Sequence, residues 1–267
     1  RQPALLAGVR ARIEEFERLC RGMLMLSERP PRSVDEAVAT GEKLSVLVMA
    51  ALLEARGVAA EAVDASQVIV TDATFGNASP MLDRTRTRAR ETLLPRLEAG
   101  VVPVVTGFNG ATADGRPTTL GRGGSDFSAS ILASVLDAQE LWIWTDVDGI
   151  MTADPNVVAD AAVLDEVSYN EAAELAYNGA KVLHPRTLAP LIEKQIPVWS
   201  KNSFAPHKPG TRIVARIGDA SGVRAITSLA RVALITIEAV NASMQGAQLM
   251  ARALDALARV NVEVLML

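Results

Sequence analysis

The chain has 267 residues, of which 49% are hydrophobic, and its formal net charge at pH 7 is −4. This length allows one large domain, or one domain plus a smaller module, around a sizeable core. The acidic balance and an aromatic content of 4% argue against a nucleic-acid-binding surface, which needs positive charge and stacking rings.

The single cysteine, Cys20, excludes an intramolecular disulfide and a cysteine-based metal site, and it fits a reducing compartment. No run reaches the roughly 20 apolar residues that span a bilayer. Residues 44–53 come nearest, but they are too few and contain Ser45. We therefore expect a soluble, cytoplasmic protein that binds neither nucleic acid nor membrane. Because the sequence opens at Arg1 rather than at a methionine, we also expect residues upstream of it.

Two helices are expected in the first part of the chain. Residues 4–26 show helical periodicity with charges on one side, and a proline pair follows them. Residues 33–36, with the sequence Ser-Val-Asp-Glu, have the form of a capping box. We therefore expect a second helix over residues 33–56, and Glu42 lies inside it.

Short strands and one charged helix come next. Residues 60–64 and 67–71 are β-like, and residues 83–99 form an arginine-rich helix whose charges indicate a solvated face. Residues 101–107 are a continuous apolar run bounded by glycine, which is typical of a strand buried on both faces of a parallel sheet. An Asp-Gly pair at 114–115 then indicates a hairpin turn.

Residues 118–126, with the sequence TTLGRGGSD, carry three glycines, an arginine and a helix-starting Ser-Asp pair. Glycine lets the backbone approach a ligand, and free N–H groups at the start of the next helix, residues 127–136, favour negative charge. Arg122 adds a planar fork that can hold a carboxylate or a phosphate. The pattern therefore predicts an anion site. The alternative is a tight strand-to-helix turn with a solvated Arg122, but an arginine between glycines favours the site.

The middle of the chain alternates strands and helices. The apolar run at 141–145 predicts a buried strand, and helices are expected at 169–177 and 185–194, followed by another short strand. This alternation predicts an α/β fold with a mostly parallel central sheet. In such sheets ligands gather outside the carboxyl ends of strands, where both the anion-site loop and the Thr145-Asp146 pair are expected.

After residue 214 the pattern changes. Residues 218–222 are small and indicate a linker. Residues 232–238 then alternate like a strand, residues 245–258 are helical and residues 262–267 are again strand-like. This β-α-β piece lacks the elements needed to cover its sheet, so we interpret it as part of a small domain.

Three groups of residues can carry chemistry. The first is the loop that contains Arg122 and Asp126, the second is residues 145–149, and the third is residues 179–185, which contain Lys181. An arginine for a carboxylate, a lysine for phosphates and acids for an ammonium group or Mg²⁺ would suit phosphoryl transfer to an amino acid.

Three segments from these groups, TTLGRGGSDFSA, WTDVDGIMTADP and NGAKVLHPRTL, resemble aspartokinases of the amino-acid kinase family in their order and spacing. The resemblance runs over residues 33–214, and residues 232–267 resemble the start of the ACT regulatory domain of that family. It implies a three-layer α/β/α sandwich with a mostly parallel central sheet (the amino-acid kinase fold), followed by part of a ferredoxin-like ACT domain. We expect the kinase domain over residues 1–217, a linker over 218–227 and the ACT part over 228–267.

The implied reaction is transfer of the γ-phosphoryl group of ATP to the side-chain carboxylate of L-aspartate, which gives 4-phospho-L-aspartate. In this family the reaction is the first step of lysine, threonine and methionine biosynthesis. Mg²⁺ is expected with ATP, held mainly by phosphates and water, so we name no protein ligand for it. The ACT resemblance implies a homodimer formed through that domain and feedback control by lysine, threonine or both.

The resemblance suggests five substrate-site residues. Arg122 matches the position that binds the α-carboxylate, and Glu42 matches a helix glutamate near the α-amino group. Ser125 and Asp126 match substrate-site positions, and Asp126 can contact the ammonium group or organise a catalytic lysine. Phe108 matches an aromatic residue beside the substrate. The structural alternatives are an exposed charge for Glu42, helix caps for the Ser-Asp pair and core packing for Phe108.

On the nucleotide side, Thr145 and Asp146 follow the strand where the family contacts adenosine. Lys181 matches the lysine beside the ATP phosphates, and Val182 belongs to the same nucleotide-binding segment. A solvated surface charge is the alternative for Lys181. We interpret His184, which precedes a proline, as structural.

The sequence also departs from the family. Met151 stands where the family often has tyrosine and Asn156 where it often has arginine, so stacking and phosphate contacts at these nucleotide-site positions should be weaker. The Lys-Phe-Gly-Gly-Thr-Ser strand of aspartokinases does not occur in the sequence, and its lysine would stabilise the transferred phosphoryl group. We therefore expect the sequence to omit an amino-terminal segment and most of the regulatory region. The competing hypothesis is a non-catalytic amino-acid sensor built on a degenerate kinase domain.

Overall fold

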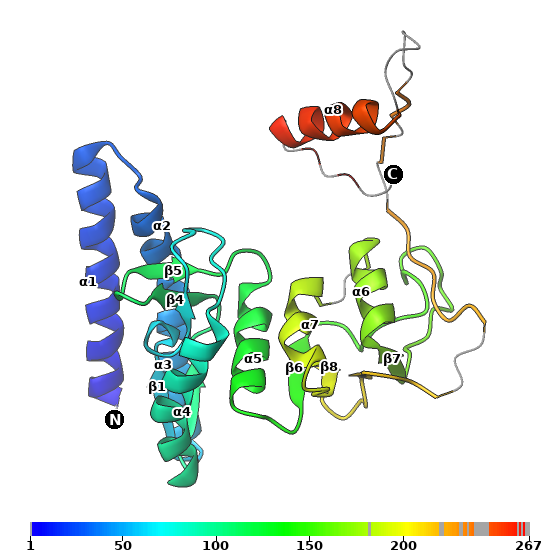
Figure 1. The fold of residues 1–267 in the computed structure, drawn as a ribbon. Helices are drawn as coiled ribbons and strands as arrows, with labels where there is room; N and C mark the ends of the chain where they lie inside the picture. The colour runs from blue at the N-terminus through cyan, green and yellow to red at the C-terminus, as the bar shows by residue number, and fades with distance from the viewer. Residues whose placement is uncertain are drawn as a thin grey trace.

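The computed structural model describes residues 2–180, 183–218, 222–229, 232–233, 235–237 and 246–260, together with 262 and 264. Within them, helices and short strands alternate along most of the chain (Figure 1). In chain order the elements are α1 (Gln2–Leu26), α2 (Pro31–Val38), α3 (Thr40–Ala55), β1 (Ala60–Val63), the 3₁₀ turn η1 (Ala65–Gln67), β2 (Val70–Thr71), α4 (Leu82–Glu98), β3 (Val102–Val105), β4 (Asn109–Thr112), β5 (Pro117–Thr119), α5 (Gly124–Val135), β6 (Leu141–Thr145), β7 (Glu166–Ser168), α6 (Tyr169–Tyr177), α7 (Pro185–Ile192), β8 (Val198–Asn202), β9 (Thr211–Val214) and α8 (Gly246–Arg259).

The first helical region differs in part from its prediction. The helix predicted at 4–26 is confirmed as α1, but the helix predicted at 33–56 is two helices, α2 and α3, separated at Ala39. The predicted capping box is wrong, because α2 begins at Pro31 without a side-chain cap. Proline suits the first helical position, since it has no N–H group to satisfy there. Asp35, part of the supposed box, is buried and accepts hydrogen bonds from β5 and from the loop before α4.

The strands pair mostly in parallel, as the alternating sequence pattern predicts. Parallel pairs join β1 to β3, β2 to β4, β6 to β8 and β7 to β9, whereas the β4–β5 and β8–β9 pairs are antiparallel. The described strands form three hydrogen-bonded groups, β1-β3, β2-β4-β5 and β6-β8-β9-β7, rather than one continuous sheet. An α/β fold rich in parallel pairing is therefore confirmed.

Two strands predicted to be fully buried are exposed on one face. In β3, Val102 is 41% exposed and the other residues are half-buried. In β6, Trp142 and Trp144 are 47% and 46% exposed, whereas Ile143 between them is buried. Among the described strands β3 pairs only with β1, and β6 only with β8, so both lie at a sheet edge. Neighbouring layers therefore cover them incompletely.

Two hydrophobic clusters form the core and meet at α5. The first joins β1, α4 and α5 and includes Val63, Leu93 and Ile131. The second joins α6 and α7 to the sheet β6-β8-β9-β7 and includes Leu188 and Val198. Helix α5 contributes side chains to both clusters, and Figure 1 shows it between the two halves of the molecule. We call α1 to β5 the amino-terminal half and β6 to β9 the carboxyl-terminal half.

The chain beyond β9 is described in part. Helix α8 confirms the helix predicted at 245–258, and Figure 1 shows it apart from the rest of the molecule. The described residues within 232–238 form no strand, in contrast to the prediction. Most of the strand predicted at 262–267 lies outside the described residues.

Residues 222–229, predicted to belong mostly to a linker, lie along α6. Arg224 forms an ion pair of 2.9 Å with Glu171 at the start of that helix. At its other end, the Thr227 hydroxyl donates to the Asn178 carbonyl over 3.1 Å. This segment is therefore attached to the carboxyl-terminal half.

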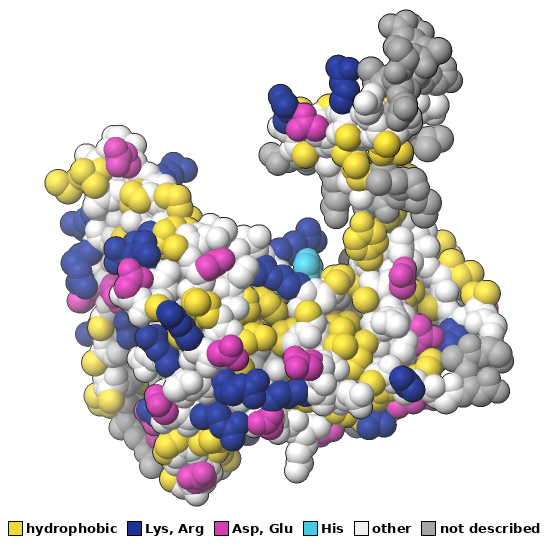
Figure 2. Space-filling view, in the orientation of Figure 1, with side chains coloured by type: hydrophobic (Ala, Val, Ile, Leu, Met, Phe, Trp, Pro, Cys, Tyr) yellow, Lys and Arg dark blue, Asp and Glu magenta, His cyan; other side chains and the backbone are white. Residues whose placement is uncertain are grey.

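The surface carries mixed charge. Figure 2 shows acidic and basic side chains interspersed over the face in view, and hydrophobic side chains at the carboxyl end of α1, where Leu24, Met25 and Leu26 are exposed. Among the described helices, none combines the length and the apolar character that crossing a bilayer would require.

Candidate active site

Several of the predicted site residues lie just after strands or in the first turn of α5. Gly107 and Phe108 come just after β3, and the first turn of α5 packs against them. Helix α5 begins beside these residues and is followed in the chain by β6. Strand β8 runs parallel to β6 and ends beside it, with Asn202 in register with Thr145. The predicted substrate residues Gly107 and Phe108 therefore follow a strand of one group, and the predicted nucleotide residues follow a strand of another.

Glu42 connects three segments of the chain. The Ser125 hydroxyl donates to Glu42 Oε1 over 3.0 Å, and the Gly107 N–H donates to Glu42 Oε2 over 3.3 Å. The side chain is half-buried at the start of α3. It is therefore a hydrogen-bonded acid at the end of β3, which excludes the alternative of a free helix charge.

Gly107 allows this close approach. A Cβ atom at position 107 would lie 2.8 Å from Ser125 Cβ and 2.9 Å from Ser125 Cα. Backbone atoms cannot be displaced as easily as the end of a flexible side chain, so any larger residue would push α5 away from Glu42.

Phe108 has an unusual backbone conformation. Its φ angle is +67°, which is uncommon for a bulky residue and costs roughly 1–3 kcal/mol. Its N–H donates to the Ser128 hydroxyl over 2.9 Å, and its ring packs against Gly124. Because the residue is half-buried, simple core packing does not account for it. Strain that the surroundings maintain in this way is typical of binding sites.

The glycine-rich loop begins α5 without a side-chain cap. Gly123 is the N-cap residue with φ +70°, and the helix starts at Gly124, three residues earlier than predicted. Ser125 and Asp126 therefore lie in the first turn, and the helix-cap alternative is wrong for both. Gly121 also has a positive φ, +76°, which glycine adopts readily.

Arg122 and Asp126 present charges that the described residues leave unpaired. Arg122 is exposed, and no hydrogen bond or ion pair to its guanidinium occurs within the described part of the chain. Burial raises the pKa of Asp126 above its ordinary value of 3.8. A half-buried carboxylate without a cationic neighbour is costly, so it favours a cationic ligand. The turn thus offers an arginine for an anion and an acid for a cation.

On the nucleotide side, β6 and β8 fix one loop. Ser203 donates through its N–H and its hydroxyl to the Thr145 carbonyl, over 2.8 and 3.0 Å. The Thr145 hydroxyl lies 3.2 Å from Asp146 Oδ1, within hydrogen-bonding distance. Lys208 and Asn202 both donate to Asp148, and they hold the pKa of this carboxyl below its ordinary value. Asp146 itself is exposed beside this loop.

The two departures from the family pattern lie in the next turn. Met151 is half-buried and forms an isolated β-bridge with Val163. Asn156 is exposed, and its side-chain amide and N–H both donate to Asp154 Oδ1 over 2.9 Å. The Asn156 side chain is thus held by its own turn, and the Met151 backbone is held by the bridge.

The predicted phosphate-side residues, Lys181 and Val182, lie outside the described residues. Further along, His184 packs against Gly123 and caps α7 by accepting the Arg186 N–H over 3.2 Å. The structural interpretation of His184 is therefore confirmed. His184 thus brings the start of α7 against the arginine loop.

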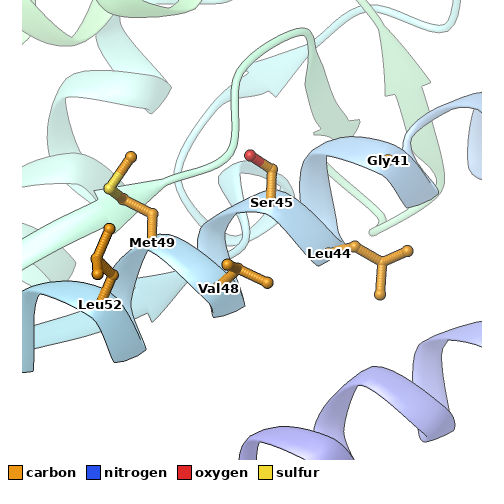
Figure 3. A pocket seen from close by; sticks show the side chains of 6 residues that line it. All are labelled: Gly41, Leu44, Ser45, Val48, Met49 and Leu52. Carbon is orange, nitrogen blue, oxygen red and sulfur yellow. The ribbon is translucent and has the colours of Figure 1, made fainter. Parts of the chain in front are cut away.

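Other features of the described chain do not add to this site. An apolar depression of about 390 Å³ lies on α3, and Ser45 is the one polar side chain among the lining residues labelled in Figure 3. It carries no charged group and is distinct from the Glu42 cluster. No set of three or more His, Cys, Asp or Glu side chains among the described residues is arranged to hold a metal ion.

Sequence reasoning missed two charged residues that support the site. Asp35 is 2% exposed and accepts hydrogen bonds from the Thr119 hydroxyl and N–H and from the Gly76 N–H. Arg186 contacts the loop before α4 and the carbonyl of Leu120. The sequence pattern around Asp35 suggested a helix cap rather than a buried hydrogen-bond acceptor. Arg186 belongs to no local sequence pattern that would indicate its contacts.

The profile of the amino acid kinase family matches residues 2–202. The lysine-sensitive aspartokinase 3 of Escherichia coli strain K12 is 40% identical over 256 residues, which are 94% of this chain and 57% of that protein. The chloroplastic aspartokinase 1 of Arabidopsis thaliana is 41% identical over 204 residues, 75% of this chain and 36% of that protein. The chain thus spans about half the length, or less, of these relatives.

A solved structure gives the same result. The crystal structure of E. coli aspartokinase III in complex with aspartate and ADP, in the R-state, matches with a TM-score of 0.76 and 37% identity. The match covers 94% of this chain and 57% of that chain. The same enzyme with lysine and aspartate, in the T-state, matches with a TM-score of 0.68 and 43% identity over 76% of this chain and 47% of that chain.

Proposed function

This chain belongs to the amino acid kinase family, and from that premise we propose that it is an aspartate kinase domain. The proposed reaction transfers the γ-phosphoryl group of ATP to the side-chain carboxylate of L-aspartate and gives 4-phospho-L-aspartate and ADP. The proposal rests chiefly on the Ser125–Glu42 hydrogen bond, which fixes an acid beside the turn of Arg122 and Asp126. The bacterial and plant aspartokinase relatives support the choice of substrate.

The charges of this turn complement those of an amino acid. In the proposal, Arg122 binds the α-carboxylate through two parallel hydrogen bonds. Glu42 and Asp126 face the ammonium group, which satisfies the half-buried carboxylate of Asp126. Ser125 and the ring of Phe108 line the substrate. This arrangement leaves the side-chain carboxylate of L-aspartate free to react.

The reaction needs positioning more than proton transfer. The attacking carboxylate has an ordinary pKa of about 3.9, so it is ionised at neutral pH without a general base. One of its oxygens bonds to the γ-phosphorus, and the bond from that phosphorus to the bridging oxygen breaks, so ADP leaves. Because both reactants are anions, the protein must align them and supply positive charge. Lys181 is the proposed source of that charge in this chain.

The nucleotide is placed at the ends of β6 and β8 in this proposal. Thr145 and Asp146 contact the adenosine portion, and Met151 and Asn156 belong to the turn beside it. Val182 joins Lys181 in the segment that approaches the phosphates. Mg²⁺ bound to the ATP phosphates and to water would neutralise part of their charge.

Regulation and assembly form part of the same proposal. We assign residues 1–217 to the kinase domain, 218–227 to a linker and 228–267 to part of an ACT domain that forms a homodimer. Lysine, with threonine as a second candidate, is the proposed feedback effector, and the lysine-sensitive relative supports it. A cytoplasmic enzyme at the start of lysine, threonine and methionine biosynthesis fits the lone cysteine.

Calorimetry combined with an ADP-release assay tests the proposal. L-aspartate is titrated into the protein, with L-glutamate, L-asparagine and D-aspartate as matched competitors, and ADP is then measured with MgATP present. The proposal requires saturable binding of L-aspartate over these analogues and ADP release that depends on it. Selective binding without turnover would identify an amino-acid sensor instead, and absence of binding would reject the substrate assignment.

A further inference from the structure

Arg186, in the first turn of α7, makes four contacts with the amino-terminal half and α5. Its Nη1 donates to Asn77 Oδ1 over 2.7 Å and to the Leu120 carbonyl over 3.0 Å, and its Nη2 donates to the Ala78 carbonyl over 2.9 Å. The guanidinium carbon also lies 4.7 Å from the centre of the Phe127 ring. The side chain is half-buried, so these contacts are partly shielded from water.

These contacts surround the arginine loop. The Leu120 carbonyl directly precedes Gly121 and Arg122, and Phe127 lies one turn into α5. Asn77 limits the loop from outside, because a Cβ atom on Gly121 would lie 2.6 Å from Asn77 Oδ1. The atom that Arg186 holds is thus the atom that packs against Gly121.

The loop needs such support. Gly121 and Gly123 adopt positive φ angles of 76° and 70°, and glycine samples many other conformations with little penalty. A ligand that had to order this turn would bind more weakly by the entropy of ordering it. Contacts that order the turn in advance remove this cost.

We propose that Arg186 is a positioning residue for L-aspartate binding, which holds the turn of Gly121 to Gly123 so that Arg122 faces the substrate. The inference rests on the proposed function, since it takes L-aspartate as the ligand of that turn. His184 adds a second contact from the same segment, to Gly123. The start of α7 and the loop assigned to carboxylate binding are thereby held together by two described residues, Arg186 and His184.

The chemistry requires arginine at this position. The guanidinium is a planar fork that reaches three acceptors at once while its face lies on an aromatic ring. A lysine offers one point charge on a flexible stem and cannot bind all three acceptors in this geometry. Arg186→Lys is therefore a test of shape at constant charge.

The experiment measures the dissociation constants of L-aspartate and of MgADP by calorimetry for Arg186→Ala and Arg186→Lys. We expect Arg186→Ala to weaken L-aspartate binding about 10-fold or more, because the turn is no longer ordered in advance, and to change MgADP binding by less than about 3-fold. Arg186→Lys should recover only part of the loss. Guanidinium ion at millimolar concentration should partly restore L-aspartate binding to Arg186→Ala.

Asn77→Ala gives a second variant on an exposed side chain. It removes the acceptor but keeps Arg186, and it should also weaken L-aspartate binding. In the double variant, the loss of L-aspartate binding free energy should be smaller than the sum of the losses in the two single variants, because both changes remove the same interaction. This variant keeps the test decisive even where Arg186→Ala does not fold.

Arg90→Ala is the matched control. Arg90 joins α4 to the end of α5 through the Val135 carbonyl at 3.4 Å and Asp137 at 2.8 Å. Its loss should lower the melting temperature without changing L-aspartate binding. A similar result for Arg186→Ala and Asn77→Ala, with lower stability but unchanged affinity below the melting temperature, would overturn the inference. Binding of L-aspartate by the unaltered protein separates the two claims. If that protein binds no L-aspartate, the proposed function itself fails. If it binds L-aspartate and the variants bind it equally well, only the role of Arg186 fails.

Discussion

The Ser125 hydroxyl donates a hydrogen bond to Glu42 Oε1 over 3.0 Å, although the two residues lie 83 positions apart. This contact joins the start of α3 to the first turn of α5 beside the end of β3. It places an acid next to a turn that also carries an arginine. The proposed substrate site depends on this relationship, and the first prediction tests it.

Glu42→Gln removes the negative charge but keeps a side chain that can form hydrogen bonds. We expect L-aspartate affinity to fall about 10-fold to 100-fold, because a hydrogen bond to a charged group contributes about 1.5–3 kcal/mol. Calorimetry measures the effect. Glu91→Gln, on the exposed face of α4, is the control and should bind L-aspartate normally. Equal affinity in the two variants would contradict the role of Glu42.

Arg122 and Lys181 are expected to affect different ligands. Arg122→Ala should raise the KM for L-aspartate about 10-fold or more and leave the KM for ATP nearly unchanged, because it removes a bidentate carboxylate contact. Lys181→Ala should chiefly raise the KM for ATP. Steady-state kinetics with each substrate varied in turn gives both values. The substrate assignment would be wrong if Arg122→Ala left L-aspartate kinetics untouched.

The raised pKa of Asp126 predicts how stability changes with pH. The folded-state pKa lies above the ordinary value of 3.8, so the unfolded chain loses this proton first as pH rises. In the pH window between the ordinary pKa and the folded-state pKa, Asp126 therefore lowers the free energy of unfolding more and more as pH rises. Above this window the loss is constant. Asp126→Asn should raise the free energy of unfolding at pH 7 but not below the window, as urea unfolding at several pH values can measure.

Asp126 also predicts how binding changes with pH. An ammonium group favours the ionised carboxylate, so L-aspartate affinity should rise with pH as Asp126 ionises in the free protein and should level off above its folded-state pKa. In Asp126→Asn this rise should disappear, while overall affinity falls. A pH dependence that survives in the variant would show that another group causes it.

Gly107→Ala tests the close approach between β3 and α5. The added Cβ would lie 2.8 Å from Ser125 Cβ, so we expect a loss of about 1–3 kcal/mol in the free energy of unfolding, and weaker L-aspartate binding. Gly22→Ala, about one turn before the end of α1, meets nothing within 4 Å and should stabilise the protein by about 0.5–1 kcal/mol. Two variants of the same chemistry should thus have opposite effects. A neutral Gly107→Ala would exclude the proposed constraint.

Much of the fold follows from local patterns in the sequence. Helical patterns located α1 and α8, an arginine-rich run located α4, and the alternation of strands and helices indicated the parallel pairing. Local patterns do not report which strands lie at an edge, and for this reason the exposure of Val102 and Trp142 was not predicted. Likewise, the Ser-Val-Asp-Glu pattern suggested a cap, whereas Asp35 is buried against Thr119.

In the candidate site, too, local patterns predicted some residues, whereas others depend on contacts between distant parts of the chain. The glycine-rich sequence was enough to predict the turn of Arg122 as a candidate anion site, since glycines and an arginine directly precede a helix start. Glu42 could be assigned only through family resemblance, because its partner Ser125 is distant in sequence. Arg186 had neither signal. Its role depends on acceptors about 66 to 109 residues away, which only the folded chain brings together.

The measurement that tests the proposed function most directly is L-aspartate-dependent phosphoryl transfer with hydroxylamine as a trap. Hydroxylamine converts an acyl phosphate into a stable hydroxamate, which can be counted against the ADP released. Our account predicts that aspartyl hydroxamate and ADP form in equal amounts and only when L-aspartate and MgATP are both present. Saturating L-aspartate binding with no hydroxamate above the background without ATP would contradict it.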